Sequence, residues 1–159
     1  MKAFHIRSTI LLLFCFLLSC SENKEETSST RNRTLTFTET VTFLNAADEP
    51  ITSIDVAIAD SEQETQLGLM FVNELEEDKG MLFVFNQSSP RSFWMANTPL
   101  PLDIIFVNSD FEIVRIHRNT PPFSRESFSS EAPAQYVVEV IGGFTVRHDI
   151  QEGMKIRRN

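Results

Sequence analysis

The sequence predicts a mainly β single domain, a compact sandwich or partly closed barrel with one or two short helices. About seven or eight short apolar or alternating stretches are separated by turn residues at intervals of roughly 8–12 residues. Only one segment carries a clear helix-start signal. Apolar residues make up 42% of the 159 residues, which is enough for one core and excludes general disorder.

The first nineteen residues have the pattern of a signal peptide. Lys2 and Arg7 give a basic start, and the apolar run at 10–18 is too short to span a membrane comfortably. The run ends in LLSC at 17–20, which resembles the lipobox of bacterial lipoproteins. That resemblance implies that Cys20 becomes the first residue and carries three acyl chains, a stable anchor. The alternative is an ordinary secretory signal with Cys20 downstream by chance.

We therefore expect three parts: a signal peptide at 1–19, a lipid-anchored flexible tether at 20–33 and a β domain at 34–159. The tether is polar and has no apolar period. Lys24-Glu25-Glu26 resembles the short export signal of surface lipoproteins in Bacteroidetes-type bacteria, although a solvated linker explains it equally well. The expected location is the bacterial cell envelope, either facing the periplasm or exposed at the surface.

Cysteine use and charge exclude several classes of function. Cys15 leaves with the signal and Cys20 takes the lipid, so no disulfide, cysteine metal cluster or thiol nucleophile remains. Cleavage also removes Lys2 and Arg7, leaving 12 basic against 22 acidic residues, a net charge of −10. This charge argues against nucleic acid and against electrostatic docking on anionic lipid. We expect a monomer without a cofactor, held at the membrane by its anchor.

The N-terminal half of the domain begins with a half-buried strand at 35–43, in which apolar residues share one face and threonines the other. A turn at 45–50 leads to a second strand at 52–59. Ser61 and Glu64 then form a capping-box pattern, which predicts a helix of about two turns closed by Gly68.

The central stretch from Gly80 to Phe106 organises the chain. It predicts strands at 81–85, 92–95 and 102–107. The first of these is apolar on both faces, so we expect it to be buried on both sides. Two prolines within 97–101 exclude a helix or a central strand there and indicate a stiff, extended crossing.

The C-terminal third continues with a turn at 108–110 and a strand at 112–117. A loop of seventeen residues with three prolines is predicted at 118–134, anchored by Phe123 and Phe128. The remaining predictions are a strand at 136–141, a sharp turn at Gly142-Gly143 and a short closing strand at 154–156.

Five sequence blocks occur in order: GLM at 68–70, GMLFVF at 80–85, FWM at 93–95 followed by NT, PLDIIF at 101–106, and EV-I-G-G near 139–143. Their order and spacing across about 59–156 resemble the domain of unknown function 192 (DUF192) family. The resemblance implies a jelly-roll-like β fold, often exported in bacteria, and no established reaction. The family usually carries arginines where this chain has Thr65, Leu67 and Val72, and a lysine where it has Ala96. Any anionic ligand held by those basic residues would be lost or changed here.

Asp103 and Glu139 are the two carboxylates placed within strongly apolar strands. A buried charge must pair, take up a proton or face a cavity. One hypothesis is a catalytic carboxylate pair for general acid/base work, as in glycoside cleavage. The structural alternative, which we favour, is that Asp103 caps the proline-rich turn and Glu139 pairs with Arg91 or Arg115.

Any functional site is predicted where the stiff crossing meets the strand of Glu139. The candidate ligand-binding residues are Trp94, Asn97, Thr98, Asp103 and Glu139. Trp94 offers a ring face and an N–H donor, although such a residue more often belongs to the core. His117 and His148 do not form a metal-ligand spacing, and neither a Gly-x-Ser-x-Gly elbow nor a phosphate loop occurs.

Two functions remain. The favoured one is a non-catalytic envelope lipoprotein, a binding or accessory module with an unknown small-molecule or envelope partner. The alternative is a small hydrolase or sugar-active enzyme using Asp103 and Glu139 as a carboxylate pair.

Overall fold

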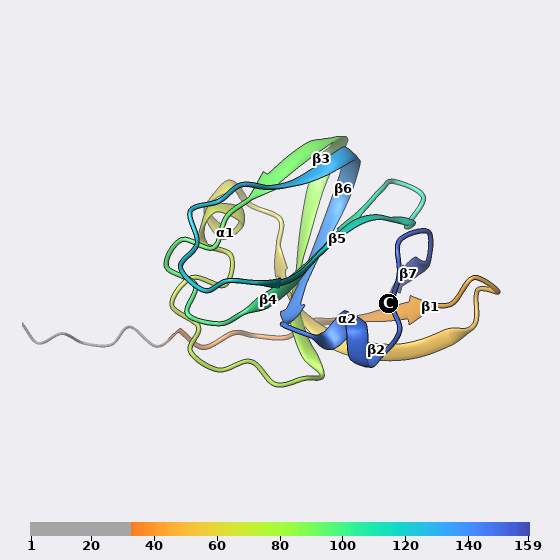
Figure 1. Ribbon diagram of the computed structural model, residues 1–159, viewed down its shortest axis with the longest axis horizontal. Helices are drawn as coiled ribbons and strands as arrows, with labels where there is room; N and C mark the ends of the chain where they lie inside the picture. The colour runs from red at the N-terminus through yellow and green to blue at the C-terminus, as the bar shows by residue number, and fades with distance from the viewer. Residues whose placement is uncertain (1–32) are drawn as a thin grey trace, which may run out of the picture. The chain divides into compact units, whose positions relative to one another are not determined.

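Seven strands form one strongly curved sheet with the order β5-β4-β6-β3-β2-β1-β7 (Figure 1). The computed structural model describes residues 33–159; the signal peptide, Cys20 and nearly all of the tether lie outside the described residues. The strands are β1 (Glu39–Leu44), β2 (Pro50–Ala59), β3 (Lys79–Phe93), β4 (Leu102–Val107), β5 (Ile113–Thr120), β6 (Phe128–Ile141) and β7 (Lys155–Arg158), and the helices are α1 (Glu62–Leu67) and α2 (Phe144–Arg147). The prediction of a mainly β domain is confirmed.

The two edges of the sheet meet, so the barrel is partly closed. Glu112, just before β5, forms an antiparallel bridge with Lys155 of β7. The amide of Ile113 donates to the carbonyl of Met154 at 2.7 Å, and the amide of Ile156 donates to the carbonyl of Phe111 at 2.9 Å. Pairing edge groups in this way removes exposed hydrogen-bonding edges along that part of the sheet.

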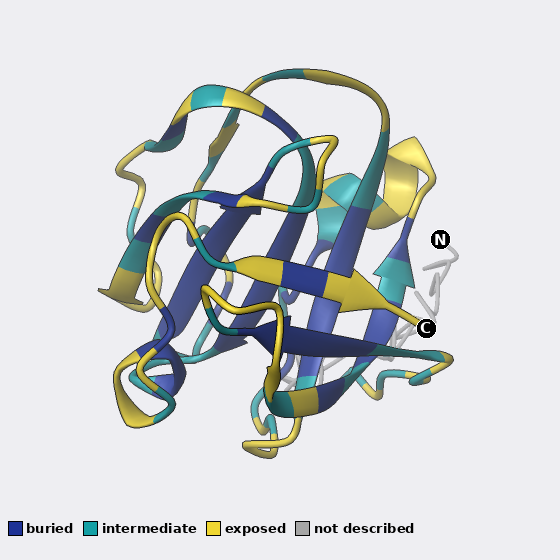
Figure 2. Ribbon diagram, turned by 90° about the vertical axis from the view of Figure 1, so that its right-hand side faces the viewer, coloured by how far each residue is buried: buried dark blue, intermediate teal, exposed yellow. Residues whose placement is uncertain are grey.

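All of β4, the start of β3 at 80–83 and the end of β6 at 137–140 are buried on both faces (Figure 2). Leu82 belongs to the core inside the curve, whereas Met81 and Phe83 belong to a second core on the outer face. The inner core also contains Val41, Phe43, Ile54, Val56, Ile105, Val138 and Val140, and the outer core contains Leu69, Met95, Leu102, Ile104, Phe106 and Val137. This confirms the predicted two-sided burial for 81–83, whereas Val84 and Phe85 are half-buried.

Helix α1 has the predicted capping box. The backbone amide of Glu64 donates to Ser61 Oγ, and Glu64 Oε2 accepts from the backbone amide of Ser61, both at 3.2 Å. Gly68 ends the helix at φ +45°, with its amide donating to the carbonyl of Glu64 at 2.8 Å. The left-handed backbone at Gly68 lets the chain leave the helix sharply.

Strand β3 is a single strand of 15 residues, whereas the sequence predicted two strands with a connection at 86–91. Its polar second half stays in the sheet because it pairs with β6, with Pro90 opposite Pro133. The register shifts on both sides of Pro90, and such bulges are where strands tolerate proline. Consequently the predicted loop at 118–134 is wrong in extent, because only 121–127 lies between β5 and β6.

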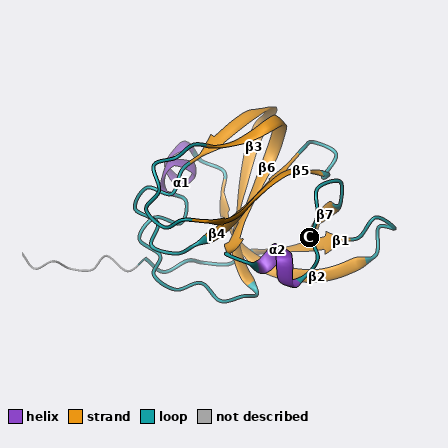
Figure 3. Cartoon of the chain, viewed as in Figure 1, coloured by secondary structure: helices purple, strands orange, loops and turns teal. Residues whose placement is uncertain are grey.

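Helix α2 follows the predicted turn at Gly142-Gly143 and was not expected from the sequence (Figure 3). Phe144, the first residue of α2, is buried in the inner core with its ring 5.6 Å from that of Phe43. Phe128 is partly buried against the outer core as expected, but Phe123 is 63% exposed and does not anchor its loop. Between residues 33 and 159, neither helix has the length and apolar character needed to cross a membrane.

Candidate ligand-binding site

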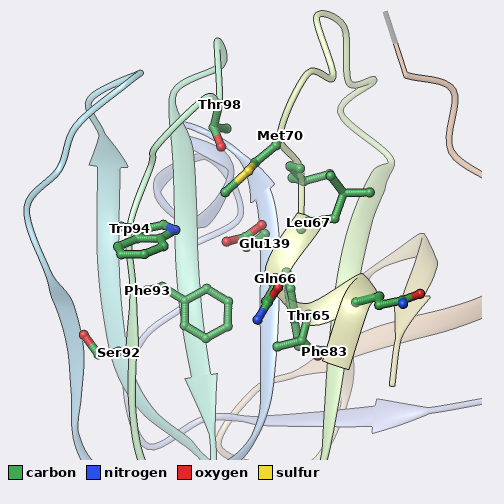
Figure 4. A pocket seen from close by; sticks show the side chains of 13 residues that line it. Thr65, Gln66, Leu67, Met70, Phe83, Ser92, Phe93, Trp94, Thr98 and Glu139 are labelled. Atoms are coloured by element: carbon green, nitrogen blue, oxygen red, sulfur yellow. The ribbon is translucent and has the colours of Figure 1, made fainter. Parts of the chain in front are cut away.

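A pocket of about 860 Å³ opens on the outer face of the sheet, between α1 with its following turn and the end of β3 (Figure 4). The lining residues are Gln63, Thr65, Gln66, Leu67, Gly68, Leu69, Met70, Phe83, Ser92, Phe93, Trp94, Thr98 and Glu139. Gln63, Gln66, Ser92 and Trp94 are exposed, and Phe83, Leu69 and Thr98 are buried. The pocket is therefore polar at its mouth and largely apolar at depth.

Backbone hydrogen bonds hold the two walls of the pocket together. The amide of Phe71, in the turn after α1, donates to the carbonyl of Asn97 at 2.9 Å. The amide of Thr98 donates to the carbonyl of Met95 at 3.1 Å, and the carbonyl of Thr98 accepts from the amide of Phe123 at 3.0 Å. Because these bonds join main-chain groups, the pocket is formed without a ligand, as is usual for small-molecule sites.

Of the described residues that line the pocket, only Glu139 has an ionisable side chain. Its carboxyl group points into the pocket between Trp94 and Leu67, although the residue is only 4% exposed (Figure 4). No hydrogen bond or ion pair to this carboxyl group is present within residues 33–159, and burial raises its pKa to about 8. Glu139 is thus mainly protonated at pH 7.

The ion pair predicted for Glu139 is wrong, because both candidate arginines have other partners. Arg91 lies 3.8 Å above the ring of Phe85 and donates to backbone carbonyls. Arg115 pairs with Glu131 at 3.1 Å. The carboxyl group of Glu139 therefore faces the pocket and pairs with neither arginine.

Asp103 is buried but does not reach the pocket. On the neighbouring strands β4 and β6, Asp103 pairs with Val140, and Ile104 pairs with Glu139. Residues directly opposite in an antiparallel pair share a face and successive residues alternate, so Asp103 and Glu139 point to opposite faces. The structure does not bring the two carboxyl groups together.

Asp103 instead fixes the start of α2. Its carboxylate accepts hydrogen bonds from the backbone amides of Asn119 at 2.7 Å, Gly143 at 3.0 Å and Thr145 at 2.8 Å. A fourth comes from the Thr145 hydroxyl at 2.7 Å. These bonds hold together three segments that are distant in sequence, which is a structural role. The turn that Asp103 caps is the one at 142–145 rather than the proline-rich one.

Comparison with known proteins gives the family. The profile of DUF192, described as "Uncharacterized ACR", matches residues 43–158. The chain belongs to the DUF192 family. No match was found among curated proteins.

Two crystal structures share the fold of this DUF192 domain. One is a protein of Sinorhizobium meliloti described, provisionally, as a transcription regulator; it is 31% identical, with a TM-score of 0.74 over 79% of this chain and 98% of that one. The other is a protein of unknown function from Novosphingobium aromaticivorans, 32% identical, with a TM-score of 0.72 over 77% of this chain and 86% of that one. Both likenesses support the fold and the family.

Three of the five candidate residues of the DUF192 domain, Trp94, Thr98 and Glu139, come together in the pocket lining. Asn97 lies beside the pocket, where its Nδ2 is 3.9 Å from the sulfur of Met70, and Asp103 lies on the other face of the sheet. The wall formed by α1 and its turn was not expected from the sequence. Helix α1 has no buried residue, and no local signal shows that it borders a pocket and not open solvent.

The described part of the DUF192 domain contains no group of three His, Cys, Asp or Glu side chains placed to hold a metal ion. His117 Nε2 lies 2.7 Å from the carbonyl oxygen of Ser129, and His148 Nε2 lies 3.7 Å from Glu77. Neither histidine lines the pocket.

Proposed function

We propose that this DUF192 domain is a non-catalytic binding module that holds a small molecule in the pocket at Glu139. The observation that carries the proposal is the carboxyl group of Glu139, which faces the cavity and has no hydrogen-bond or ion-pair partner among residues 33–159, although the residue is only 4% exposed. Burying a polar group without a hydrogen bond costs about 1–3 kcal/mol in proteins. A ligand that forms a hydrogen bond or ion pair with this carboxyl group would offset that cost. Ionisable groups with perturbed pKa values are often found at functional sites for this reason.

The geometry gives little support to the alternative of a hydrolase or sugar-active enzyme. Glycosidases need two carboxyl groups flanking the same bond. Here Asp103 is on the opposite face from Glu139 and is saturated with hydrogen bonds. Regulation of transcription, as described for the Sinorhizobium relative, is also disfavoured for this chain by its net charge of −8, because DNA binding depends on neutralising phosphates.

We further propose that the domain works at the bacterial cell envelope, anchored through acyl chains on Cys20. The support lies in the sequence: a short apolar run ends in LLSC, and thirteen polar residues follow before the domain. In this arrangement the tether lets the pocket sample the space around its anchor.

A ligand screen tests the binding function. Residues 21–159, which contain every described residue, are screened against a metabolite library by ligand-observed NMR and thermal shift. Hits are measured on the wild type, on Glu139→Leu, and on Glu74→Leu as a control at an exposed carboxylate. We expect at least one compound that binds the wild type and the control and loses at least tenfold affinity in Glu139→Leu. The proposal is overturned if no compound binds, or if Glu139→Leu binds every hit as well as the wild type.

A further inference from the structure

The ionisable side chains in the pocket lining determine which ligand charge the pocket favours. Among the residues from 33 to 159 that line it, none is Lys, Arg or His. The strands beside Glu139 offer only apolar neighbours, Met81 of β3 and Ile104 of β4. An anionic ligand would therefore meet no cation here, and it would have to share the site with a carboxyl group.

The charged groups behind the pocket wall are already engaged. Arg33 donates from Nη1 to the carbonyl oxygen of Gly68, the glycine that lines the pocket after α1. Glu64 of α1 is held by the amide and hydroxyl of Ser61. Neither group supplies the counter-charge that Glu139 lacks.

The remaining walls suit an apolar or aromatic body. Phe83 and Leu69 are buried at depth, and Phe93 extends the apolar surface toward the mouth. Trp94 lines the same pocket and is 62% exposed, so its ring is open to a ligand (Figure 4). Exposed tryptophan rings bind apolar groups, and their faces attract cations more strongly than other aromatic rings do.

We propose that the ligand is an organic cation, a primary ammonium or guanidinium compound with an apolar body, whose nitrogen binds the carboxylate of Glu139. This rests on the proposed function and specifies its ligand class. The cation provides the charge-assisted hydrogen bonds that the carboxyl group lacks, and the apolar body packs against Phe93 and Trp94. The buried hydroxyl-bearing Thr98 adds a polar atom to the same lining.

Binding of such a ligand is coupled to proton release. Burial raises the pKa of Glu139 to about 8, so the free pocket holds a proton at pH 7. A cation favours the ionised carboxylate and displaces that proton. The apparent affinity for an ammonium compound should therefore rise about tenfold per pH unit from pH 6 toward pH 8 and level off above it.

Three probes that share a phenylpropyl group but differ in charge test the inference. They are the cation 3-phenylpropylammonium, the neutral 3-phenylpropan-1-ol and the anion 3-phenylpropanoate. The ammonium stays charged up to pH 9, because its pKa is near that of lysine, about 10.4. Binding to residues 21–159 is followed by the fluorescence of Trp94, the one tryptophan of the chain. The proteins are the wild type, Glu139→Gln and the exposed control Glu74→Gln.

At pH 8 we expect the ammonium probe to bind the wild type and the control at least tenfold more tightly than the alcohol, and the propanoate to bind least. Glu139→Gln should reduce the ammonium probe to the affinity of the alcohol and remove the pH dependence. The cation proposal is overturned if the alcohol or the propanoate binds best, if Glu139→Gln keeps the preference, or if none of the probes binds. A neutral or anionic hit from the library that is lost in Glu139→Leu would overturn it too, yet leave the binding function standing.

Discussion

Asp103 and Glu139 stand one position apart in the register of β4 and β6, and this single step places their carboxyl groups on opposite faces of the sheet. One carboxylate accepts four hydrogen bonds from the protein, and the other faces a pocket. Two residues of similar chemistry thus have separate roles, so substitutions at the two positions should have separable effects.

Asp103→Asn should destabilise the domain without changing the pocket. An amide nitrogen would replace one of the two oxygens. It would face either the amides of Asn119 and Gly143, which donate to Oδ1, or the amide and hydroxyl of Thr145, which donate to Oδ2, so hydrogen bonds to a charged acceptor are lost. We expect the free energy of unfolding to fall by about 2–4 kcal/mol, measured by urea denaturation. The folded variant should bind 3-phenylpropylammonium with wild-type affinity. Wild-type stability combined with lost binding would contradict this assignment.

Glu139→Gln should change how stability depends on pH. The pKa of Glu139 is raised from 4.5 to about 8 in the folded state, so the folded protein holds a proton that the unfolded chain has lost. The stabilisation is complete below pH 4.5 and declines by about 1.4 kcal/mol per pH unit until pH passes 8. Denaturation between pH 5 and 8 should show this decline in the wild type and a flatter profile in Glu139→Gln. Parallel profiles would show that burial does not perturb this group.

The carboxylates with lowered pKa act in another pH range and do not obscure that test. Hydrogen bonds from Arg158 lower the pKa of Glu39, and a hydrogen bond from Lys79 lowers the pKa of Asp55. Their contributions are present above the unfolded pKa values, near 4, and are lost as the pH falls further. The difference between the wild-type and Glu139→Gln profiles between pH 5 and 8 therefore reports on Glu139.

Trp94→Ala should leave stability almost unchanged and weaken ligand binding. The side chain is 62% exposed, so truncation removes little buried surface. We expect a change within about 0.5 kcal/mol in unfolding free energy and at least a fivefold loss of affinity, measured by calorimetry because the fluorophore is gone. Phe83→Ala is the comparison: Phe83 is 1% exposed, and its truncation should cost about 3–5 kcal/mol. If Trp94→Ala bound the ligand with wild-type affinity, Trp94 would not contribute to binding.

Gly80→Ala should destabilise the domain through a steric clash at the strand that carries Glu139. A Cβ atom at Gly80 would lie 2.7 Å from the carbonyl oxygen of Glu139 and 3.0 Å from Ile54. Overpacking of this kind costs about 1–3 kcal/mol. A Cβ atom at Gly153 would meet nothing within 4 Å, but the backbone there has φ +88°. Gly153→Ala therefore isolates the backbone cost, about 1 kcal/mol. Thermal denaturation should rank Gly80→Ala as the less stable variant, and the reverse order would contradict the close approach of β3 and β6.

Cys20→Ala should release the protein from the membrane. The lipobox-like ending makes Cys20 the expected site of acylation. In bacteria expressing the full chain, the wild type should fractionate with membranes and incorporate labelled palmitate, and the variant should do neither. Cys15→Ala is the control, because Cys15 leaves with the signal. Unchanged fractionation and labelling in Cys20→Ala would exclude the anchor.

Signals that depend only on neighbouring residues in the sequence predicted much of the fold. The capping box at Ser61 and Glu64 is present, and β4 has the predicted bounds, Leu102–Val107. The polar half of β3 was missed because it is held by pairing with β6, a non-local interaction that its own composition does not reveal. The same pairing turned residues 128–134 of the predicted loop into strand, and pairing with β4 extended β5 to Thr120.

The candidate site, like the fold, could be predicted from the sequence only in part. The isolation of Glu139 among apolar residues indicated burial, and the two prolines that follow Thr98 within 97–101 indicated a stiff crossing. Which face each carboxylate occupies depends on strand register, and a shift of one residue reverses it. The wall from α1 was not predictable, because it depends on how the turn at Gly68 returns the chain to the sheet.

The pairing of β7 with β1 has a consequence for how the domain folds. Arg158, near the end of the chain, forms an ion pair with Glu39 and is 119 residues from it in sequence, and Asn159 exchanges backbone hydrogen bonds with Thr40. Contacts between such distant segments slow folding, because a long loop must close before they form. Until β7 (Lys155–Arg158) has been synthesised, β1 keeps an unpaired edge and the sheet cannot close.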